Sequence, residues 1–290
     1  MRTYSGIVID TSAIILTLRC NLKCKLCCTA SPYQNPPPHF SVKSIEHCVK
    51  RYFETVKYIR KLSLGGGEPM LRTDLPEIVE AILEYKKQFD ILEIITNGTI
   101  VPKDAVLDIL QKNKDTMFVM IDNYGKHSPN AEKIDAILNE KGINHKVRIY
   151  HGTNAHMGGW VDLGDYTHKH SHNETKALLR ECVIATTPKQ HTGTYTPMPN
   201  KIIKNALLIP YLAMTNGLLH RCARSYSTML AGRITKDSDS FVDTMDESSS
   251  INEIQDKIIR MVSSEYLSAC EYCNGFSGKS KRFEPAEQLI

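Results

Sequence analysis

Apolar and polar positions along the first half of the chain show two periodicities, one typical of buried strands and one typical of helices. Short apolar, β-branched runs predict five buried strands, at residues 14–18, 59–64, 92–95, 117–121 and 146–150. Between them, apolar residues recur at helical spacing and predict four helices, at residues 41–56, 74–83, 102–112 and 131–141. Ser41 and Asp74 have the short polar side chains that favour helix N-termini, and Gly142 stands where a C-terminal cap belongs.

This alternation of strands and helices is typical of right-handed βαβ units around a parallel sheet. The sequence therefore predicts an α/β fold as far as Tyr150. Periodicity alone leaves open whether the sheet stays flat or curls into a partial barrel.

After Tyr150 the pattern changes. Residues 158–166 are rich in glycine and aspartate, and a helix is predicted to end near Cys182. Residues 188–200 are rich in proline and threonine, which favours a loop or an insertion.

The last third of the chain combines a hairpin signal with a helix. Asn216-Gly217 separates two apolar runs, and this dipeptide supplies the positive φ angles that a tight hairpin turn needs. An amphipathic helix is predicted at 251–266. We therefore expect one domain at residues 1–168 and a smaller α+β domain at 169–290.

Composition narrows the class of protein. The chain has 290 residues, 41% hydrophobic and 23% charged, with a formal net charge of only +4. No basic stripe with interleaved aromatic residues indicates nucleic acid, and no apolar run approaches the ~20 residues that span a bilayer. The first residues lack the pattern of a signal peptide, so we expect a cytoplasmic protein with no membrane or nucleic-acid partner.

The 9 cysteines need a separate explanation. They stand at positions 20, 24, 27, 28, 48, 182, 222, 270 and 273. Their odd number and their bunching argue against a disulfide framework. In a reducing compartment, clustered cysteines indicate metal ligands or catalytic thiols.

Cys20, Cys24 and Cys27 form a Cys-x3-Cys-x2-Cys loop directly after the first predicted strand. Three thiolates can hold three irons of a four-iron cube and leave the fourth iron open to another ligand, whereas four cysteines close an ordinary cluster. A zinc site with a distant fourth ligand is the alternative.

A glycine-rich turn follows the second predicted strand and reads Gly65-Gly66-Gly67-Glu68-Pro69. Glycines at the carboxyl end of a parallel strand let a ligand approach the backbone closely. Glu68 can receive an ammonium group. A plain strand-to-helix turn is the alternative interpretation.

Together the two motifs resemble the signature of the radical S-adenosylmethionine (SAM) superfamily. The resemblance implies a partial (β/α)6 barrel, a 4Fe–4S cluster on the three cysteines, and SAM on its open iron. It also implies a set of SAM-side residues: Leu26, Gly66, Gly67, Glu68, Asn97 and Asp122. Leu26 departs from the family pattern, which has an aromatic residue beside the adenine.

The late cysteines Cys182, Cys222, Cys270 and Cys273 come from separate predicted elements. Four thiolates can close a 4Fe–4S cluster or a zinc site. The hairpin cysteine and the final Cys-x2-Cys-Asn-Gly resemble a Twitch domain, a shortened SPASM domain with one auxiliary 4Fe–4S cluster. The proline- and threonine-rich insertion lengthens the usual spacing after Cys182.

Two cysteines fit neither group. Cys28 adjoins the first group, where we expect a packed thiol rather than a hydrogen-atom donor, and Cys48 lies in the middle of a predicted helix.

The resemblance implies reductive cleavage of SAM to a 5′-deoxyadenosyl radical that removes a hydrogen atom from a substrate. A reductant such as flavodoxin or ferredoxin would supply the electron. Relatives with a Twitch domain oxidise an alcohol carbon of an aminocyclitol or epimerise sugars, so we expect a dehydrogenase acting on a small polar molecule. We nominate Arg148 and Tyr150, which alternate on the fifth strand, for binding a substrate hydroxyl or removing its proton.

Other functions stay open. A sugar epimerase and a peptide-modifying radical SAM enzyme are alternatives, although few residues precede the first predicted strand, where a leader-peptide domain would stand. An iron–sulfur electron carrier needs no open iron and no SAM-binding turn, so it is disfavoured. A zinc-binding interaction module is a third possibility, which the colour and iron content of anaerobically purified protein would distinguish.

Overall fold

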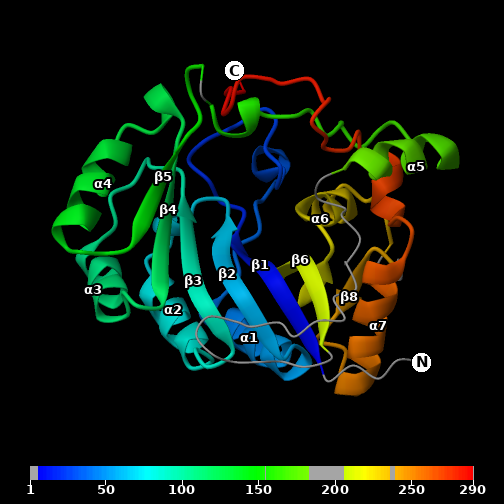
Figure 1. Cartoon of the computed structure of the whole chain (residues 1–290), viewed down its shortest axis with the longest axis horizontal. Helices are drawn as coiled ribbons and strands as arrows, with labels where there is room; N and C mark the ends of the chain where they lie inside the picture. The colour runs from blue at the N-terminus through cyan, green and yellow to red at the C-terminus, as the bar shows by residue number, and fades with distance from the viewer. Residues whose placement is uncertain (1–5, 154, 183–205, 236–238, 290) are drawn as a thin grey trace.

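The computed structural model describes residues 6–153, 155–182, 206–235 and 239–289. A sheet with the strand order β5-β4-β3-β2-β1-β6-β7-β8 forms its centre (Figure 1). The strands are β1 (Ile7–Thr17), β2 (Tyr58–Gly66), β3 (Phe89–Thr96), β4 (Met117–Asn123), β5 (His145–Ile149), β6 (Leu207–Thr215), β7 (Leu218–His220) and β8 (Phe241–Asp243). Strands β1 to β6 pair in parallel, which confirms the α/β fold class.

Five helices cover the outer side of the curved sheet, whereas α5 and α6 lie at its upper end (Figure 1). The five are α1 (Val42–Thr55), α2 (Leu75–Leu83), α3 (Asp104–Lys112), α4 (Ala131–Glu140) and α7 (Ile251–Ser263), and the other two are α5 (His172–Glu181) and α6 (Ala223–Leu230). Ser41 caps α1 as expected, because its hydroxyl accepts the Ser44 N–H. Asp74 stands at the start of α2 but does not cap it, since its carboxylate pairs with the buried Arg72.

Strand β1 starts well before the predicted strand at 14–18. Polar residues at 10–12 interrupt the apolar pattern and hide the continuity of the strand. Ser12 is nevertheless fully buried, because its hydroxyl bonds the Tyr52 hydroxyl at 2.7 Å and donates to the Leu212 carbonyl at 3.1 Å.

The sixth parallel strand has an unexpected position. It is β6, the first strand of the Asn216-Gly217 hairpin, and it pairs with β1 rather than following β5. The second half of the chain therefore extends the sheet of the first half. The division at residue 168 stays an expectation, and the predicted loop at 188–200 lies outside the described residues.

The two faces of the sheet differ in chemistry. Apolar side chains such as Leu62, Leu64 and Leu92 are fully buried in the hydrophobic core between sheet and helices. The alternate positions form rows on the inner face, where Ser63 stands opposite Glu93, and Asp122 opposite Arg148. This inner face is polar and charged.

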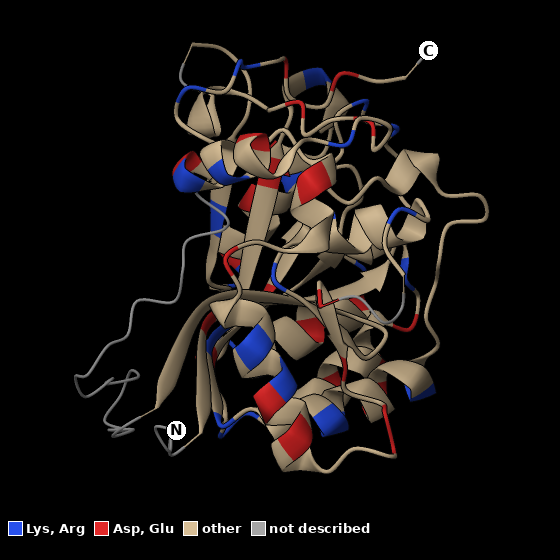
Figure 2. Ribbon diagram, turned by 90° about the vertical axis from the view of Figure 1, so that its right-hand side faces the viewer, with Lys and Arg blue, Asp and Glu red and all other residues tan. Residues whose placement is uncertain are grey.

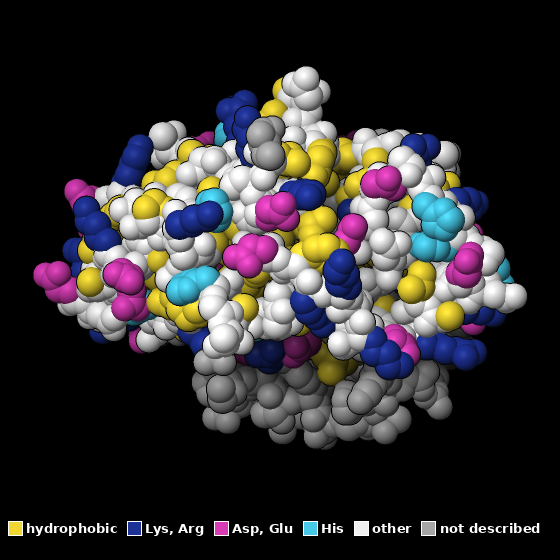
Figure 3. Space-filling model, turned by 90° about the horizontal axis from the view of Figure 1, so that it is seen from above, with side chains coloured by type: hydrophobic (Ala, Val, Ile, Leu, Met, Phe, Trp, Pro, Cys, Tyr) yellow, Lys and Arg dark blue, Asp and Glu magenta, His cyan; other side chains and the backbone are white. Residues whose placement is uncertain are grey.

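Residues of both charge signs are mixed along the helices on the side shown in Figure 2. Lys/Arg and Asp/Glu positions are interspersed there, in keeping with the small net charge. The end of the molecule above the sheet has apolar side chains at its centre, bordered by charged ones (Figure 3). None of the helices in the described part of the chain has the length and apolar character that a bilayer crossing requires.

Candidate functional site

The loop after β1, residues 18–28, holds the first three cysteines and is called the cysteine loop. Cys24 is buried, and Cys20 and Cys27 are partly exposed. Burial raises the pKa of the Cys20 thiol to about 11 and that of Cys24 to about 12, and the nearby Cys27 thiol raises both further. The predicted ligands therefore gather in one place, and metal binding would have to displace their protons.

Hydrogen-bond donors surround these sulfur atoms. The Leu22 N–H donates to Cys20 Sγ at 3.4 Å, and the Asn97 side-chain amide lies 3.7 Å from the same atom. The Gln288 side-chain amide donates to Cys24 Sγ at 3.4 Å. Such donors stabilise thiolates bound to iron, so the loop fits an iron–sulfur cluster.

Gln288 belongs to residues 283–289, here called the closing segment, which crosses over the cysteine loop. Its backbone pairs with the loop, because the Lys25 N–H donates to the Glu287 carbonyl at 2.7 Å and the Leu289 N–H to the Lys23 carbonyl at 2.8 Å. A further bridge joins Phe283 to Trp160. Nothing in the sequence pattern indicated this cover, because it depends on contacts between positions more than 250 residues apart.

The glycines at the end of β2 allow two backbones to approach. The Gly67 N–H donates to the Thr17 carbonyl at 2.7 Å and the Glu68 N–H to the Arg19 carbonyl at 2.9 Å. A Cβ on Gly67 would stand 2.0 Å from the Arg19 oxygen, whereas a Cβ on Gly65 would meet open space. Gly67 is therefore required for the close packing of the cysteine loop against the end of β2, whereas Gly65 borders open space beside that loop.

Glu68 is fully buried beneath this turn. Its carboxylate accepts hydrogen bonds from the Asn97 N–H at 2.7 Å and the Thr96 hydroxyl at 2.9 Å, and from the Met70 N–H at 2.9 Å. Desolvation raises its pKa to about 7 despite these donors. The carboxylate thus ties the ends of β2 and β3 together, and its binding of the SAM ammonium group stays a prediction.

Asp122 and Arg148 form an ion pair on the inner face. Arg148 Nε lies 2.6 Å from Asp122 Oδ1, and Arg148 Nη2 lies 2.8 Å from Asp122 Oδ2. Desolvation raises the pKa of Asp122, and the Arg148 guanidinium opposes that shift. Arg148 keeps its charge, so it can bind a hydroxyl but not remove a proton.

Tyr150 follows β5 and lies in a group of rings beside that ion pair. The Tyr124 ring centroid lies 5.1 Å from that of Tyr150 and 5.6 Å from that of Trp160. The Tyr150 ring also meets the His156 ring edge-on at 5.2 Å. These contacts place both nominated residues, Arg148 and Tyr150, at one end of the inner face.

The inner face also holds a charged group that sequence reasoning missed. Glu93 is only 3% exposed, accepts from the Ser63 hydroxyl at 2.7 Å, and lies 3.6 Å from the Lys61 ammonium. The available signal was a single charged residue between the apolar neighbours Leu92 and Ile94, which face the opposite side of the strand.

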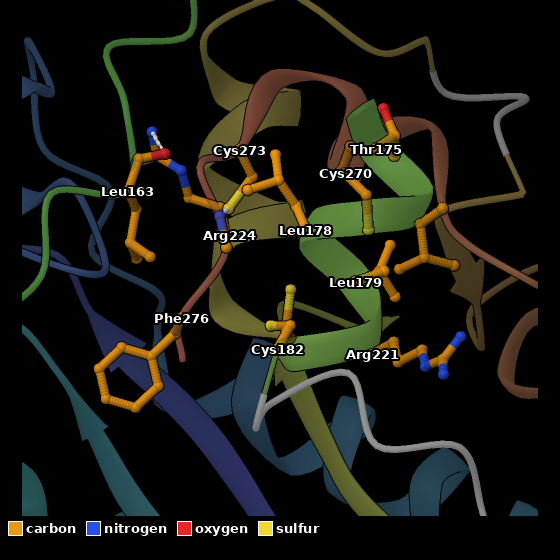
Figure 4. Close-up of a pocket in the computed structure, with 14 residues that line it drawn as sticks. Leu163, Thr175, Leu178, Leu179, Cys182, Arg221, Arg224, Cys270, Cys273 and Phe276 are labelled. Atoms are coloured by element: carbon orange, nitrogen blue, oxygen red, sulfur yellow. Dashed lines mark hydrogen bonds between the residues drawn. The ribbon is translucent and has the colours of Figure 1, made fainter. Parts of the chain in front are cut away.

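The late cysteines line one cavity (Figure 4). Cys182 follows α5 and Cys222 precedes α6, while Cys270 lies within the short 3-10 helix Ser268–Tyr272 and Cys273 directly follows it. In Figure 4 the side chains of Cys182, Cys270 and Cys273 point into the same space. The fold therefore brings together all four predicted auxiliary ligands.

The surroundings of this cavity suit anionic sulfur. Burial raises the pKa of the Cys222 thiol to about 11, and the N–H groups of Ser225 and Arg224 at the start of α6 oppose that shift. The Arg224 Nε atom lines the cavity wall and is buried without a hydrogen-bond partner. Both features fit a cluster ligated by thiolates.

No three His, Cys, Asp or Glu side chains in the described ranges converge closely enough to hold a single metal ion. The four thiols instead line a common cavity.

Leu26, Cys28 and Cys48 complete the predicted set. Leu26 is partly exposed within the cysteine loop, and Cys48 is buried in α1. Cys28 is exposed, so it is not the packed thiol that we expected.

The chain is similar to several known proteins in sequence. A segment of 123 residues, 40% of this chain and 40% of the relative, is 35% identical to a Methanococcus maripaludis protein named "Probable GTP 3',8-cyclase". A segment of 101 residues is 33% identical to the GTP 3',8-cyclase of Aliarcobacter butzleri and covers 31% of it. The chain thus spans less than half the length of these curated relatives.

Two solved structures share the fold over nearly the whole chain. BtrN in complex with AdoMet and 2-DOIA matches with a TM-score of 0.52 at 13% identity, covering 96% of this chain and 98% of BtrN. Streptococcus suis SuiB matches with a TM-score of 0.50 at 13% identity, covering 97% of this chain and 78% of SuiB.

The family model described as Radical SAM superfamily matches residues 14–160, a segment that holds both the cysteine loop and the Gly-Gly-Glu-Pro turn. The chain belongs to the radical SAM superfamily.

Proposed function

We propose that this enzyme dehydrogenates an alcohol carbon of a small polar substrate, of the aminocyclitol or sugar class. The cavity lined by four cysteines carries the proposal, because dehydrogenation releases an electron and an auxiliary 4Fe–4S cluster can accept it. To balance, the reaction would remove one hydrogen atom, one proton and one electron from the substrate: SAM would supply the radical that takes the hydrogen atom, a carboxylate of the protein would take the proton, and a cluster held by Cys182, Cys222, Cys270 and Cys273 would supply the electron acceptor.

Cys20, Cys24 and Cys27 would hold the first cluster, and Gly66, Gly67 and Glu68 would shape the SAM side of the site. When bound, SAM supplies a 5′-deoxyadenosyl radical after one-electron reduction, for which a flavodoxin or ferredoxin is the expected donor. Gly65 leaves open space at the carboxyl end of β2, and Asn97 bonds both the cysteine loop and the Thr99 hydroxyl. These residues position the cofactor rather than react.

The polar inner face supports the substrate class. Its carboxylates Glu93 and Asp122, with the Lys61 ammonium and the Arg148 guanidinium, offer donors and acceptors for several hydroxyl or amino groups. We assign proton removal to a carboxylate, because the guanidinium of Arg148 is permanently charged. Arg148 orients Asp122, and the Tyr150 ring lies at the end of this set of polar side chains.

The likeness to BtrN, whose structure contains AdoMet and 2-DOIA, agrees with a small polar substrate. The partial likeness to GTP 3',8-cyclases names GTP as a second substrate to test, and a peptide is the third substrate class to compare.

The test is anaerobic incubation of the two-cluster protein with SAM, a reductant and separate sets of aminocyclitols, sugars, GTP and peptides. We expect a product two mass units lighter than an aminocyclitol or sugar, formed with one SAM consumed per turnover and without exchange of solvent deuterium. An isomer carrying one solvent deuterium would indicate an epimerase instead, and turnover only with GTP or a peptide would refute the proposed substrate class.

A further inference from the structure

Arg224 is a buried cation beside the four-cysteine cavity. It is 7% exposed and lies in the first turn of α6, directly after Cys222 and Ala223. Its guanidinium carbon stands 3.6 Å from the centroid of the Tyr166 ring. Arg224 Nη2 donates to the carbonyls of Leu163, at 3.1 Å, and Gly164. The side chain is therefore fixed in place against the cavity wall (Figure 4).

The charge of Arg224 lacks compensation by an acidic side chain. No carboxylate in the described part of the chain forms an ion pair with it. Its Nε atom is buried without a hydrogen-bond partner among the described residues, whereas Nη1 donates to the Tyr166 hydroxyl. A buried cation that only neutral groups solvate is unfavourable, so an anionic occupant of the cavity would stabilise it.

A second buried guanidinium, that of Arg221, also lines the four-cysteine cavity. Arg221 is 6% exposed, lines the cavity and donates to the Ser264 carbonyl at 3.1 Å. Four thiolates around an oxidised 4Fe–4S core carry a net charge of about −2, which positive charge in the cavity wall stabilises. The cavity is thus matched in charge as well as in ligand number to a four-cysteine cluster.

We propose that Arg224, together with Arg221, raises the reduction potential of the auxiliary cluster and so makes it an electron acceptor. This inference rests on the proposed function, in which the cluster takes one electron from the substrate radical while the proton goes to a carboxylate. Reduction adds negative charge to the cluster, and a nearby buried cation favours the more negative state. Arg224 is therefore a positioning and tuning residue that need not touch the substrate.

The test measures the midpoint potential of the second cluster in the full-length chain. In a Cys20→Ala, Cys24→Ala, Cys27→Ala background, the electron paramagnetic resonance signal of the reduced protein comes from that cluster alone. We expect Arg224→Gln to shift the reduction equilibrium at least tenfold toward the oxidised state, a fall of ~59 mV or more. In Arg224→Lys, which keeps the charge, the midpoint potential of the second cluster should fall by less.

Arg260→Gln is the matched control, because it removes the same charge from the exposed face of α7. If Arg224→Gln keeps its iron and its potential equals that of the control, the tuning role is refuted while the proposed function stands. If Arg224→Gln loses its iron, Arg221→Gln supplies the same measurement, and an unshifted potential there is equally decisive. Absence of a second cluster from the background chain itself refutes the auxiliary site and this inference together.

Discussion

The two cysteine sites are built in opposite ways. Cys20, Cys24 and Cys27 lie in one short loop, which two backbone hydrogen bonds hold against the end of β2. The four later cysteines come from the end of α5, the start of α6 and the last 3-10 helix, so only the packing of these elements creates their cavity. A local loop can keep its shape with a few contacts, whereas a distributed site depends on the whole domain.

The electrostatic surroundings differ as well. The sulfur atoms of the first site receive hydrogen bonds from neutral amides, and the carboxylate of Glu68 lies nearby. The second site has two buried arginines in its wall. Because positive charge raises a cluster's reduction potential, the second site suits accepting an electron and the first suits donating one.

The largest expected effect is the loss of iron from one cysteine site at a time when its ligands are replaced. Anaerobic reconstitution should give about eight irons per chain, and the triple change of Cys20, Cys24 and Cys27 to Ala should leave about half. The same change at Cys222, Cys270 and Cys273 should leave the other half and preserve SAM cleavage, because the first site is local. Iron analysis with a SAM-cleavage assay checks this, and loss of all iron in either variant would contradict two independent sites.

The local construction of the first site can be broken by one methyl group. In Gly67→Ala the new Cβ would stand 2.0 Å from the Arg19 carbonyl oxygen, so the loop must move. We expect a loss of stability of about 1–3 kcal/mol and of iron at the first site only. Gly65→Ala is the control, because its Cβ meets open space and should leave iron content unchanged. Equal iron in both variants would show that the close approach is not required.

Glu68, beside the first cysteine site, should make the stability of the chain depend on pH. Its folded-state pKa of about 7 lies above the ordinary value of 4.5, so the folded chain binds more protons than the unfolded chain between these values. Stability therefore falls as pH rises from about 4.5 to about 7, by roughly 3 kcal/mol from this group. Urea unfolding of the iron-free chain measures this, and Glu68→Gln should flatten that part of the profile. If the stability of Glu68→Gln depended on pH as that of the native sequence does, Glu68 would not be the source of the pH dependence.

The smallest expected effect tests the cover over the first site. Gln288→Ala removes one amide donor from Cys24 Sγ, and fewer hydrogen bonds to sulfur lower a cluster's potential. We expect a shift of the first cluster's reduction equilibrium of less than tenfold, under ~59 mV, with the second cluster unchanged. Redox titration followed by electron paramagnetic resonance separates the two. An equal shift at both clusters would mean that the change acts through the whole fold.

Most strands and helices of the first half could be predicted because their apolar periodicities are regular. The start of β1 was missed because polar residues interrupt it at 10–12, and the buried Ser12 finds its partners only across the fold, as with Tyr52. The interior carboxylate Glu93 was overlooked although its alternation with apolar neighbours was visible. The charged wall around the second cysteine group had no sequence signal, since Arg221 and Arg224 look like ordinary surface residues.

The sequence by itself determined the features that depend on near neighbours. These are the spacing of the three-cysteine loop, the glycines that follow β2, the Asn216-Gly217 turn and the periodicities of the βα units, all governed by local geometry. The tertiary structure alone decided that β6 joins β1, that residues 283–289 cover the cysteine loop, and that four distant cysteines share a cavity with two arginines. Such contacts join residues far apart in the chain, and their free energy appears only when the elements pack together.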